Sequence, residues 1–280
     1  MAAAVDDRFG LGWRPQLAAG ILANLDSIDI VEVIADDYFD AGSKHQRALA
    51  TLAAQVPIGL HGIGMGLAST CRPDQKRIDA MARLVEKIQP ESWSEHLAFV
   101  RAGEIEIGHL AAAPRNAGTV DSTAANLERA AKTIGGIPLM ENIATLIDPP
   151  GSPLDEPQWI AGVAAASGCG LLLDLQNVFA NCMNFGTDPF AFLDRIPLHR
   201  VATVHLAGGV WMDNGQLLDD HLHDVPDQVH ALLRHLAMRV SQPLTVVLER
   251  DGNYPKMSDL LAQLDHARQA VRDGRRLAAA

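Results

Sequence analysis

Short apolar segments alternate with helical patterns along the whole chain, and this alternation limits the fold more than any other feature of the sequence. Repeated strand and helix pairs are typical of βα units around a parallel sheet. Eight segments are predicted strands: residues 9–13, 28–34, 56–61, 92–99, 137–142, 171–175, 201–206 and 244–250. A helical pattern follows each of them, at residues 16–25, 44–54, 73–88, 121–134, 157–167, 189–196, 225–240 and 258–275.

Eight consecutive strand and helix pairs with no break in composition favour a closed (β/α)8 barrel. An open, doubly wound sheet would give a similar pattern and stays an alternative. The chain has 280 residues, of which 48% are hydrophobic, and this suffices for one buried core. We therefore predict a single α/β domain that spans residues 1–280.

The acidic balance of the chain argues against several kinds of partner. There are 23 Lys and Arg against 34 Asp and Glu, and the formal net charge of −11 opposes binding to nucleic acid or to anionic membranes. The three cysteines lack the C-x-x-C spacing of thiolate metal sites. Without a signal peptide or a long apolar run, the sequence predicts a cytoplasmic protein with no membrane segment.

The ends of the predicted strands are unusually polar. Imidazoles and carboxylates lie at six of them: His61, His96, Glu141, Asp174, His205 and Glu249. In a barrel, the carboxyl ends of the strands meet at one mouth, where catalytic groups lie. Buried groups of this kind would repel one another or stay unsatisfied unless a cation lay among them. The sequence therefore predicts a metal site at the mouth.

Three further polar residues bring the number of candidate ligands to nine. Asn177 follows Asp174 closely, and the loop after the seventh strand adds Asp219 and His221. One octahedral ion accepts about six ligands, so nine imply at least two ions. Imidazoles and carboxylates without a sulfur ligand favour iron, manganese or zinc. The residues alone do not decide among these three metals.

A lone histidine is more often a surface or core residue than a metal ligand. That interpretation suits six histidines on helices or flanking segments: His45, His109, His199, His230, His235 and His266. For His61, His96 and His205 it is weaker, because an unpaired imidazole at the end of an apolar strand is costly. His223 stays open between a ligand, a residue that supports a ligand, and a substrate contact.

Eight short segments match a known family in order along the chain. They are Gly-Leu-Gly-Trp-Arg-Pro at 10–15, Val-Glu-Val-Ile at 31–34, Leu-His-Gly-Ile-Gly at 60–64, Ser-Glu-His-Leu-Ala-Phe at 94–99, Glu-Asn-Ile-Ala at 141–144, Leu-Leu-Leu-Asp-Leu-Gln-Asn-Val at 171–178, Val-His-Leu-Ala-Gly at 204–208 and Leu-Glu-Arg-Asp-Gly-Asn at 248–253. Through these segments the chain resembles the multinuclear non-haem iron-dependent oxidative enzymes, formerly catalogued as a domain of unknown function. The resemblance implies a single TIM barrel of the xylose-isomerase-like type, with iron rather than zinc at the nine candidate ligands.

Members of this family modify ribosomally made peptides, commonly at cysteine, with dioxygen (O2) as co-substrate. The resemblance implies two or three iron ions in mixed Fe(II) and Fe(III) states. It further implies that the substrate thiolate binds iron and that hydrogen is abstracted from the cysteine β-carbon. The expected partners are a precursor peptide and a small partner protein that recognises its leader segment.

Two departures from the family pattern concern the substrate rather than the metal. Where relatives often have Ala-Glu-Asn-Tyr-Phe, this chain has Ala-Asp-Asp-Tyr-Phe at 35–39. Where many have a Leu-Pro-Leu-Pro-like loop, it has Ala-Ala-Ala-Pro-Arg at 111–115. Five residues are candidate contacts to the substrate or to the ligands: Trp13, Arg14, Asp36, His223 and Arg250.

Two other functions stay open on the residues alone. A divalent-metal sugar isomerase or an endonuclease-like phosphoesterase would also gather His, Glu and Asp at its strand ends, although the net charge opposes a nuclease. The barrel could instead be a non-catalytic, metal-binding scaffold subunit of a peptide-modifying complex. Oxygen consumption with a cognate peptide separates these functions from the oxidative one.

Overall fold

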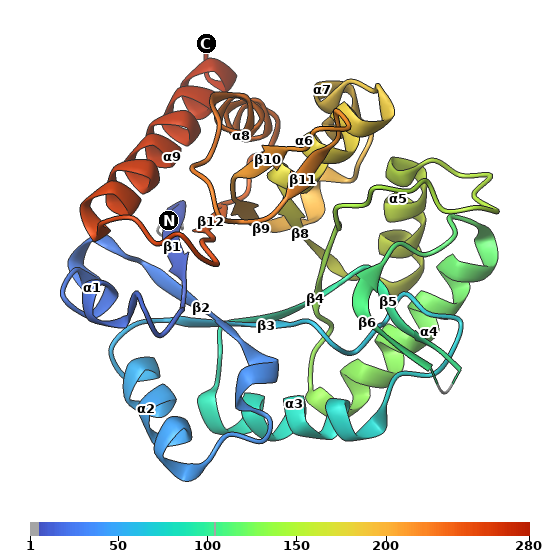
Figure 1. The fold of residues 1–280 in the computed structure, drawn as a ribbon, viewed down its shortest axis with the longest axis horizontal. Helices are drawn as coiled ribbons and strands as arrows, with labels where there is room; N and C mark the ends of the chain where they lie inside the picture. Colours follow the sequence, from blue (N-terminus) through green and yellow to red (C-terminus); the bar gives the residue numbers. More distant parts are fainter. Residues whose placement is uncertain (1–5, 104) are drawn as a thin grey trace. The chain divides into compact units, whose positions relative to one another are not determined.

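The computed structural model describes residues 6–103 and 105–280. Eight strands form a closed barrel in the order β1-β12-β9-β8-β7-β4-β3-β2 (Figure 1). Their bounds are Arg8–Gly12 for β1, Ile30–Ile34 for β2, Ile58–Gly62 for β3, Ser92–His96 for β4, Leu139–Glu141 for β7, Gly170–Asp174 for β8, Val201–Leu206 for β9 and Thr245–Leu248 for β12. The predicted (β/α)8 barrel is confirmed, and the open sheet is excluded.

The chain divides into two compact units. The first comprises Met1–Val31 and Leu172–Ala280, and the second comprises Glu32–Leu171. That residues 1–280 form one domain stays a prediction. No helix within residues 6–103 and 105–280 combines the length and the apolar character needed to cross a membrane.

The first unit contains helices α1 (Ala18–Leu22), α6 (Leu175–Phe185), α7 (Pro189–Leu193), α8 (Asp227–Arg239) and α9 (Met257–Ala278). Strand β12 pairs in parallel with β1 and with β9. Helices α8 and α9 pack together, and each buries leucines four residues apart, Leu232 and Leu236 in α8 and Leu260 and Leu264 in α9. Gly10 in β1 permits a close approach, because a Cβ there would lie 2.0 Å from the carbonyl oxygen of Ile30.

The second unit contains helices α2 (Ser43–Ala53), α3 (Gln75–Ile88), α4 (Ala117–Ile134) and α5 (Glu156–Ser167). Strand β4 pairs in parallel with β3 and β7. Helix α4 begins before the predicted residue 121, because Asn116 and Thr119 cap it reciprocally. The backbone N–H of Thr119 donates to Oδ1 of Asn116 at 3.1 Å, and the N–H of Asn116 donates to Oγ1 of Thr119 at 3.3 Å.

The sequence prediction missed two hairpins and one helix. Two antiparallel hairpins lie outside the barrel, β5 (Phe99–Ala102) with β6 (Ile105–Ala111) and β10 (Gly209–Trp211) with β11 (Leu217–Asp219). The predicted strand 92–99 therefore ends at His96 as β4, and β5 follows. Helix α6 starts directly after β8 because the Asp174 side chain caps it, accepting from the backbone N–H of Asn177 at 2.6 Å.

Candidate metal centre

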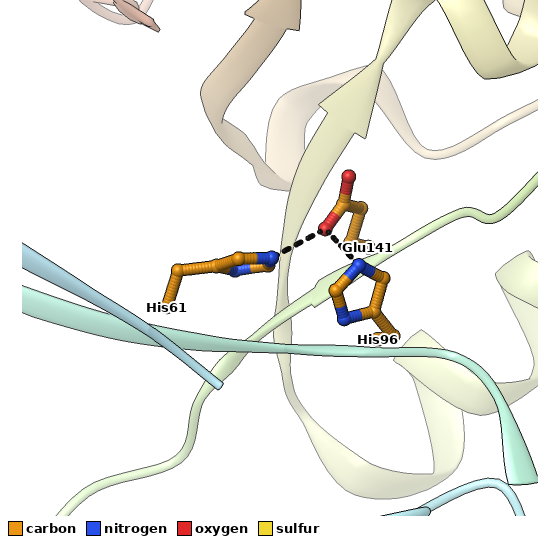
Figure 2. A group of neighbouring side chains, drawn as sticks. All are labelled: His61, His96 and Glu141. Atoms are coloured by element: carbon orange, nitrogen blue, oxygen red, sulfur yellow. Dashed lines mark ion pairs between the residues drawn. The ribbon is translucent and has the colours of Figure 1, made fainter. Parts of the chain in front are cut away.

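Three side chains from neighbouring strands converge in the second unit (Figure 2). His61 lies in β3, His96 ends β4 and Glu141 ends β7, and the strand register places His96 beside Glu141. The Nε2 atoms of both imidazoles lie 3.2 Å from the same carboxylate oxygen, Oε2 of Glu141. We call these three residues the triad; they offer one ligand atom each within 4.8 Å of one another.

Contacts on the far side of each imidazole in the triad orient its Nε2. Nδ1 of His96 lies 3.1 Å from the carbonyl oxygen of Gly62, an acceptor only, so this nitrogen carries the proton. Nδ1 of His61 lies 2.8 Å from Oγ of Ser94, which itself donates to the carbonyl oxygen of Leu60 at 3.4 Å. The Nε2 atoms are thereby directed toward Glu141, an orientation of the kind found around metal-bound histidines.

The charge around His96 favours a cation at this position. Burial disfavours the protonated imidazole, but the carboxylates of Glu141 and Glu95 outweigh that effect and raise the pKa of His96 to about 9. Glu95 is fully buried and accepts from the backbone N–H groups of His96 at 2.9 Å and of Met65 at 3.1 Å. Glu95 is thus a supporting residue that the sequence prediction did not select.

A second cluster lies in the first unit, again at strand ends. Asp174 ends β8, His205 lies in β9 and Glu249 follows β12. Their side chains are buried, with 0%, 0% and 5% exposed, and offer ligand atoms within 4.8 Å of one another. Nδ1 of His205 lies 3.0 Å from Oε2 of Glu249. Asn177, another candidate ligand, lies in the first turn of α6, which Asp174 caps.

The loop after hairpin β10–β11 brings His221 to Glu249, and Asp219 at the end of the hairpin contacts His221. Nε2 of His221 lies 3.0 Å from Oδ2 of Asp219, the last residue of β11, and its Nδ1 lies 3.6 Å from Oε2 of Glu249. The backbone of His221 has a φ of 55°, a conformation that only a few per cent of non-glycine residues adopt. Burial opposes protonation of His221, but Glu249 and Asp219 raise its pKa well above the usual value.

Asp251 links this loop to the start of the chain and was not among the predicted residues. Its Oδ1 accepts from Nε of Arg14 at 2.7 Å, and its Oδ2 lies 3.3 Å from Nδ1 of His221. An Nη of Arg14 also lies 3.6 Å from Glu249. Burial raises the pKa of Glu249, but His205 and His221 outweigh burial and hold it well below the usual range. The signal that the sequence offered for Asp251 is its position two residues after the candidate ligand Glu249.

The other candidate contact residues lie in different surroundings. Asp36 accepts from the backbone N–H of Ile63 at 2.9 Å, and burial and Glu95 raise its pKa. The carbonyl of Trp13 accepts from Arg14 at 2.9 Å. Arg250 and His223 are not members of either cluster of described side chains: Arg250 contacts the carbonyl of Asn253 and the carboxylate of Asp224, and His223 contacts Asp220.

Both clusters could hold a metal ion. Each combines imidazole nitrogen with carboxylate oxygen, the donor mixture of transition-metal sites, and each is buried where unneutralised carboxylates are costly. Of the nine predicted ligands, the described structure brings six into these two clusters, places His221 beside Glu249 and places Asp219 beside His221.

Solved structures of similar fold are xylose-isomerase-like barrels. L-ribulose 3-epimerase aligns with a TM-score of 0.62 at 14% identity, over 98% of this chain and 97% of that chain. Endonuclease IV from Thermus thermophilus aligns with a TM-score of 0.61 at 16% identity, over 95% and 99%. A xylose isomerase domain-containing protein from Salmonella typhimurium aligns with a TM-score of 0.61 at 12% identity, over 97% and 100%. These likenesses concern the fold alone.

Sequence relatives are more informative. A UPF0276 protein from Streptomyces avermitilis is 36% identical over 270 residues, covering 94% of this chain but 54% of that protein, so the chain spans about half of that relative. A UPF0276 protein from Chromobacterium violaceum is 31% identical over 265 residues, 95% of each protein. The family model described as "RiPP precursor modification enzyme MbnB/TglH/ChrH" matches residues 8–272. The chain therefore belongs to the MbnB/TglH/ChrH family of RiPP precursor modification enzymes, the multinuclear iron family that its motifs resemble.

Proposed function

We propose that this protein is an O2-dependent oxidative enzyme with a multinuclear non-haem iron centre, and that it modifies a precursor peptide at a cysteine. The triad of His61, His96 and Glu141 carries the proposal. Two histidines and one carboxylate are the ligand set of many non-haem Fe(II) oxygenases, which keep further coordination positions open. Membership of a precursor-modifying family supports a peptide as substrate.

The residues present fit iron in both clusters. The triad would hold one ion, and Asp174, His205 and Glu249 would hold another, with Asn177, Asp219 and His221 as further ligands. Bound iron would supply the redox chemistry with dioxygen that removes hydrogen from the substrate cysteine, which no side chain of the chain can supply alone. Iron in mixed Fe(II) and Fe(III) states is part of this proposal.

The protein's own residues would prepare the ligands. Gly62 and Ser94 fix the ring orientation of the two triad histidines, and Glu95 fixes the backbone of His96. Arg14 contacts Glu249, Asp251 contacts His221, and Arg14 and Asp251 are hydrogen-bonded to each other. Groups that lock ligands in this way commonly raise metal affinity by about 10-fold to 100-fold.

A precursor peptide and a small leader-binding partner are the proposed partners. The experiment co-expresses the chain with a candidate cysteine-containing precursor peptide and a candidate leader-binding protein, and measures the mass of the peptide and the oxygen consumed. A mass change that requires oxygen and is lost in Glu141→Gln supports the proposal. An unchanged peptide in the presence of an iron-loaded protein would contradict it.

Two rival functions give different results in the same assay. An isomerase or a phosphoesterase would act without consuming oxygen. Proteins of similar fold include an L-ribulose 3-epimerase and an endonuclease IV. A metal-binding scaffold subunit would bind the precursor or partner and leave both oxygen and peptide unchanged. Oxygen-dependent modification thus excludes both rivals.

A further inference from the structure

The peptide unit that joins Gly62 to Ile63 is hydrogen-bonded at both ends, within the second unit. Its carbonyl oxygen, which belongs to Gly62, accepts from Nδ1 of His96 at 3.1 Å. Its N–H, which belongs to Ile63, donates to Oδ2 of Asp36 at 2.9 Å. The carboxylate of Asp36 and the imidazole of His96 are therefore connected through one planar amide group.

Hydrogen bonds in a chain of this kind strengthen one another. A carboxylate that accepts from the N–H of an amide increases the negative charge on the carbonyl oxygen of the same amide, and that oxygen then accepts more strongly from the next donor. A stronger acceptor at Nδ1 of a histidine makes its Nε2 a better metal ligand. Nε2 of His96 is the atom that lies 3.2 Å from Oε2 of Glu141 in the triad. The charge of Asp36 thus acts on a ligand atom of the triad.

The second oxygen of Asp36 is held as well. Oδ1 accepts from Nη1 of Arg77 at 3.0 Å, and 20% of the Asp36 side chain is exposed. A Cβ at Gly64 would lie 2.8 Å from Oδ1 of Asp36 and closer still to Nη1 of Arg77, so a larger residue there would displace the ion pair. The segment Leu-His-Gly-Ile-Gly at 60–64 therefore provides both the connecting peptide unit and the space for the ion pair beside it.

Asp36 could instead serve only to anchor the loop after β3. That loop has a second anchor, because Glu95 accepts from the backbone N–H of Met65 at 3.1 Å. Of these two carboxylates, Asp36 bonds to the peptide unit whose carbonyl oxygen accepts from His96. This difference gives Asp36 an effect on the histidine ring that anchoring alone does not require.

We propose that Asp36 is a positioning residue of the triad: acting through the peptide unit of Gly62 and Ile63, its carboxylate fixes the Nδ1 proton of His96 and strengthens Nε2 as a ligand atom. This assignment rests on the proposed metal function. It deepens that function by adding a residue outside both clusters of described side chains to the groups that prepare the ligands.

The first test is NMR of the metal-free full chain, labelled with nitrogen-15 at histidine and isoleucine. Ile63→Val and His96→Gln assign the amide N–H resonance of Ile63 and the Nδ1–H resonance of His96. Spectra are recorded at about pH 8, because burial raises the pKa of Asp36 above the ordinary aspartate value of about 3.9. Asp36→Asn should shift both resonances upfield, since a neutral amide oxygen accepts more weakly than a carboxylate.

The matched control is Asp37→Asn, which removes the same charge from the exposed neighbouring residue and should leave both resonances in place. The second test titrates the metal-free chain with Fe(II) alone, without oxygen and in competition with a chelator. Asp36→Asn should bind Fe(II) about tenfold more weakly than the unchanged chain, and Asp37→Asn should bind it equally well.

An unmoved His96 resonance in folded Asp36→Asn would overturn the assignment, and a shift of the Ile63 resonance alone would show that Asp36 only anchors the loop. Shifts of equal size in Asp37→Asn would overturn it too, because the charge would then act without the peptide unit. The NMR result is independent of iron. A chain that shows the expected shifts but binds no iron would contradict the proposed metal function and leave the connection between Asp36 and His96 standing.

Discussion

Asp251 accepts a 2.7 Å hydrogen bond from Nε of Arg14, a residue 237 positions earlier in the chain. The other oxygen of Asp251 faces His221, whose backbone is held in an unusual positive-φ conformation. The backbone N–H of Asp251 also donates to the carbonyl oxygen of His221 at 2.9 Å. Asp251 therefore fixes both the ring and the backbone of a candidate ligand.

Asp251→Asn should weaken iron binding about 10-fold to 100-fold, because the amide loses the charge that pairs with Arg14 and orients His221. Competition with a chelator measures the affinity. Asp265→Asn is the matched control, since Asp265 pairs with Arg268 on the surface with 73% of its side chain exposed. Equal affinities of the two variants would show that Asp251 has no role in positioning His221.

Glu141→Ala and Asp174→Ala should each lower the iron bound per chain and abolish activity while the fold stays intact. Asp174 also caps α6, so its replacement by alanine should cost about 1 kcal/mol in addition, whereas Asp174→Asn keeps a capping side chain. Elemental analysis and circular dichroism report the two effects separately. Full iron loading of Glu141→Ala would show that Glu141 is not a ligand of the proposed centre. Glu128→Ala, which changes an exposed residue of α4, is the control.

The metal-free protein should lose stability as the pH rises toward 9. The folded-state pKa of His96 is raised to about 9 from 6.5, so protonation favours the folded state below pH 6.5 and that gain disappears as the pH passes through 9. The expected loss in the free energy of unfolding is roughly 3 kcal/mol. Chemical denaturation of the chelator-treated protein and of His96→Gln across this range measures it. Both proteins contain His221, so its contribution cancels in the comparison. If the free energy of unfolding changes with pH equally in both proteins, the charge environment assigned to His96 is wrong.

Gly209→Ala should destabilise the hairpin β10–β11, which carries Asp219. A Cβ at Gly209 would lie 2.4 Å from the carbonyl oxygen of Leu218 and 2.5 Å from Nε2 of the fully buried Gln176. Such overpacking typically costs about 1 to 3 kcal/mol. Gly42→Ala is the control, because nothing lies within 4 Å of its Cβ position. Thermal unfolding of both variants measures the difference, and equal melting temperatures would show that the close approach does not constrain the hairpin.

The sequence predicted several barrel strands because they contain runs of aliphatic or β-branched residues, as in Leu171, Leu172 and Leu173 of β8. The start of α6 could not be predicted from the sequence, because an aspartate at position 174 fits the end of a strand as well as a helix cap. The hairpins were missed for another reason. Strands β5, β10 and β11 have only four, three and three residues, and the turns of the two hairpins depend on single glycines, Gly103 and Gly215, that adopt positive φ.

The candidate ligands were selected from their places at strand ends, which is a local signal. The residues that support them carry no such signal. Glu95 is buried next to His96, yet nothing in the sequence distinguishes its inward side chain from a solvent-facing one. Arg14 and Asp251 lie 237 positions apart in the chain, and only the tertiary structure shows that they pair.

The most direct test of a multinuclear iron centre is to purify the protein without exposure to oxygen and to determine its metals. Iron, manganese and zinc are counted per chain by elemental analysis, and Mössbauer spectra are recorded on protein loaded with iron-57. The account predicts two or more irons per chain, some of them exchange-coupled. A single zinc or manganese that survives reconstitution with excess iron would contradict it.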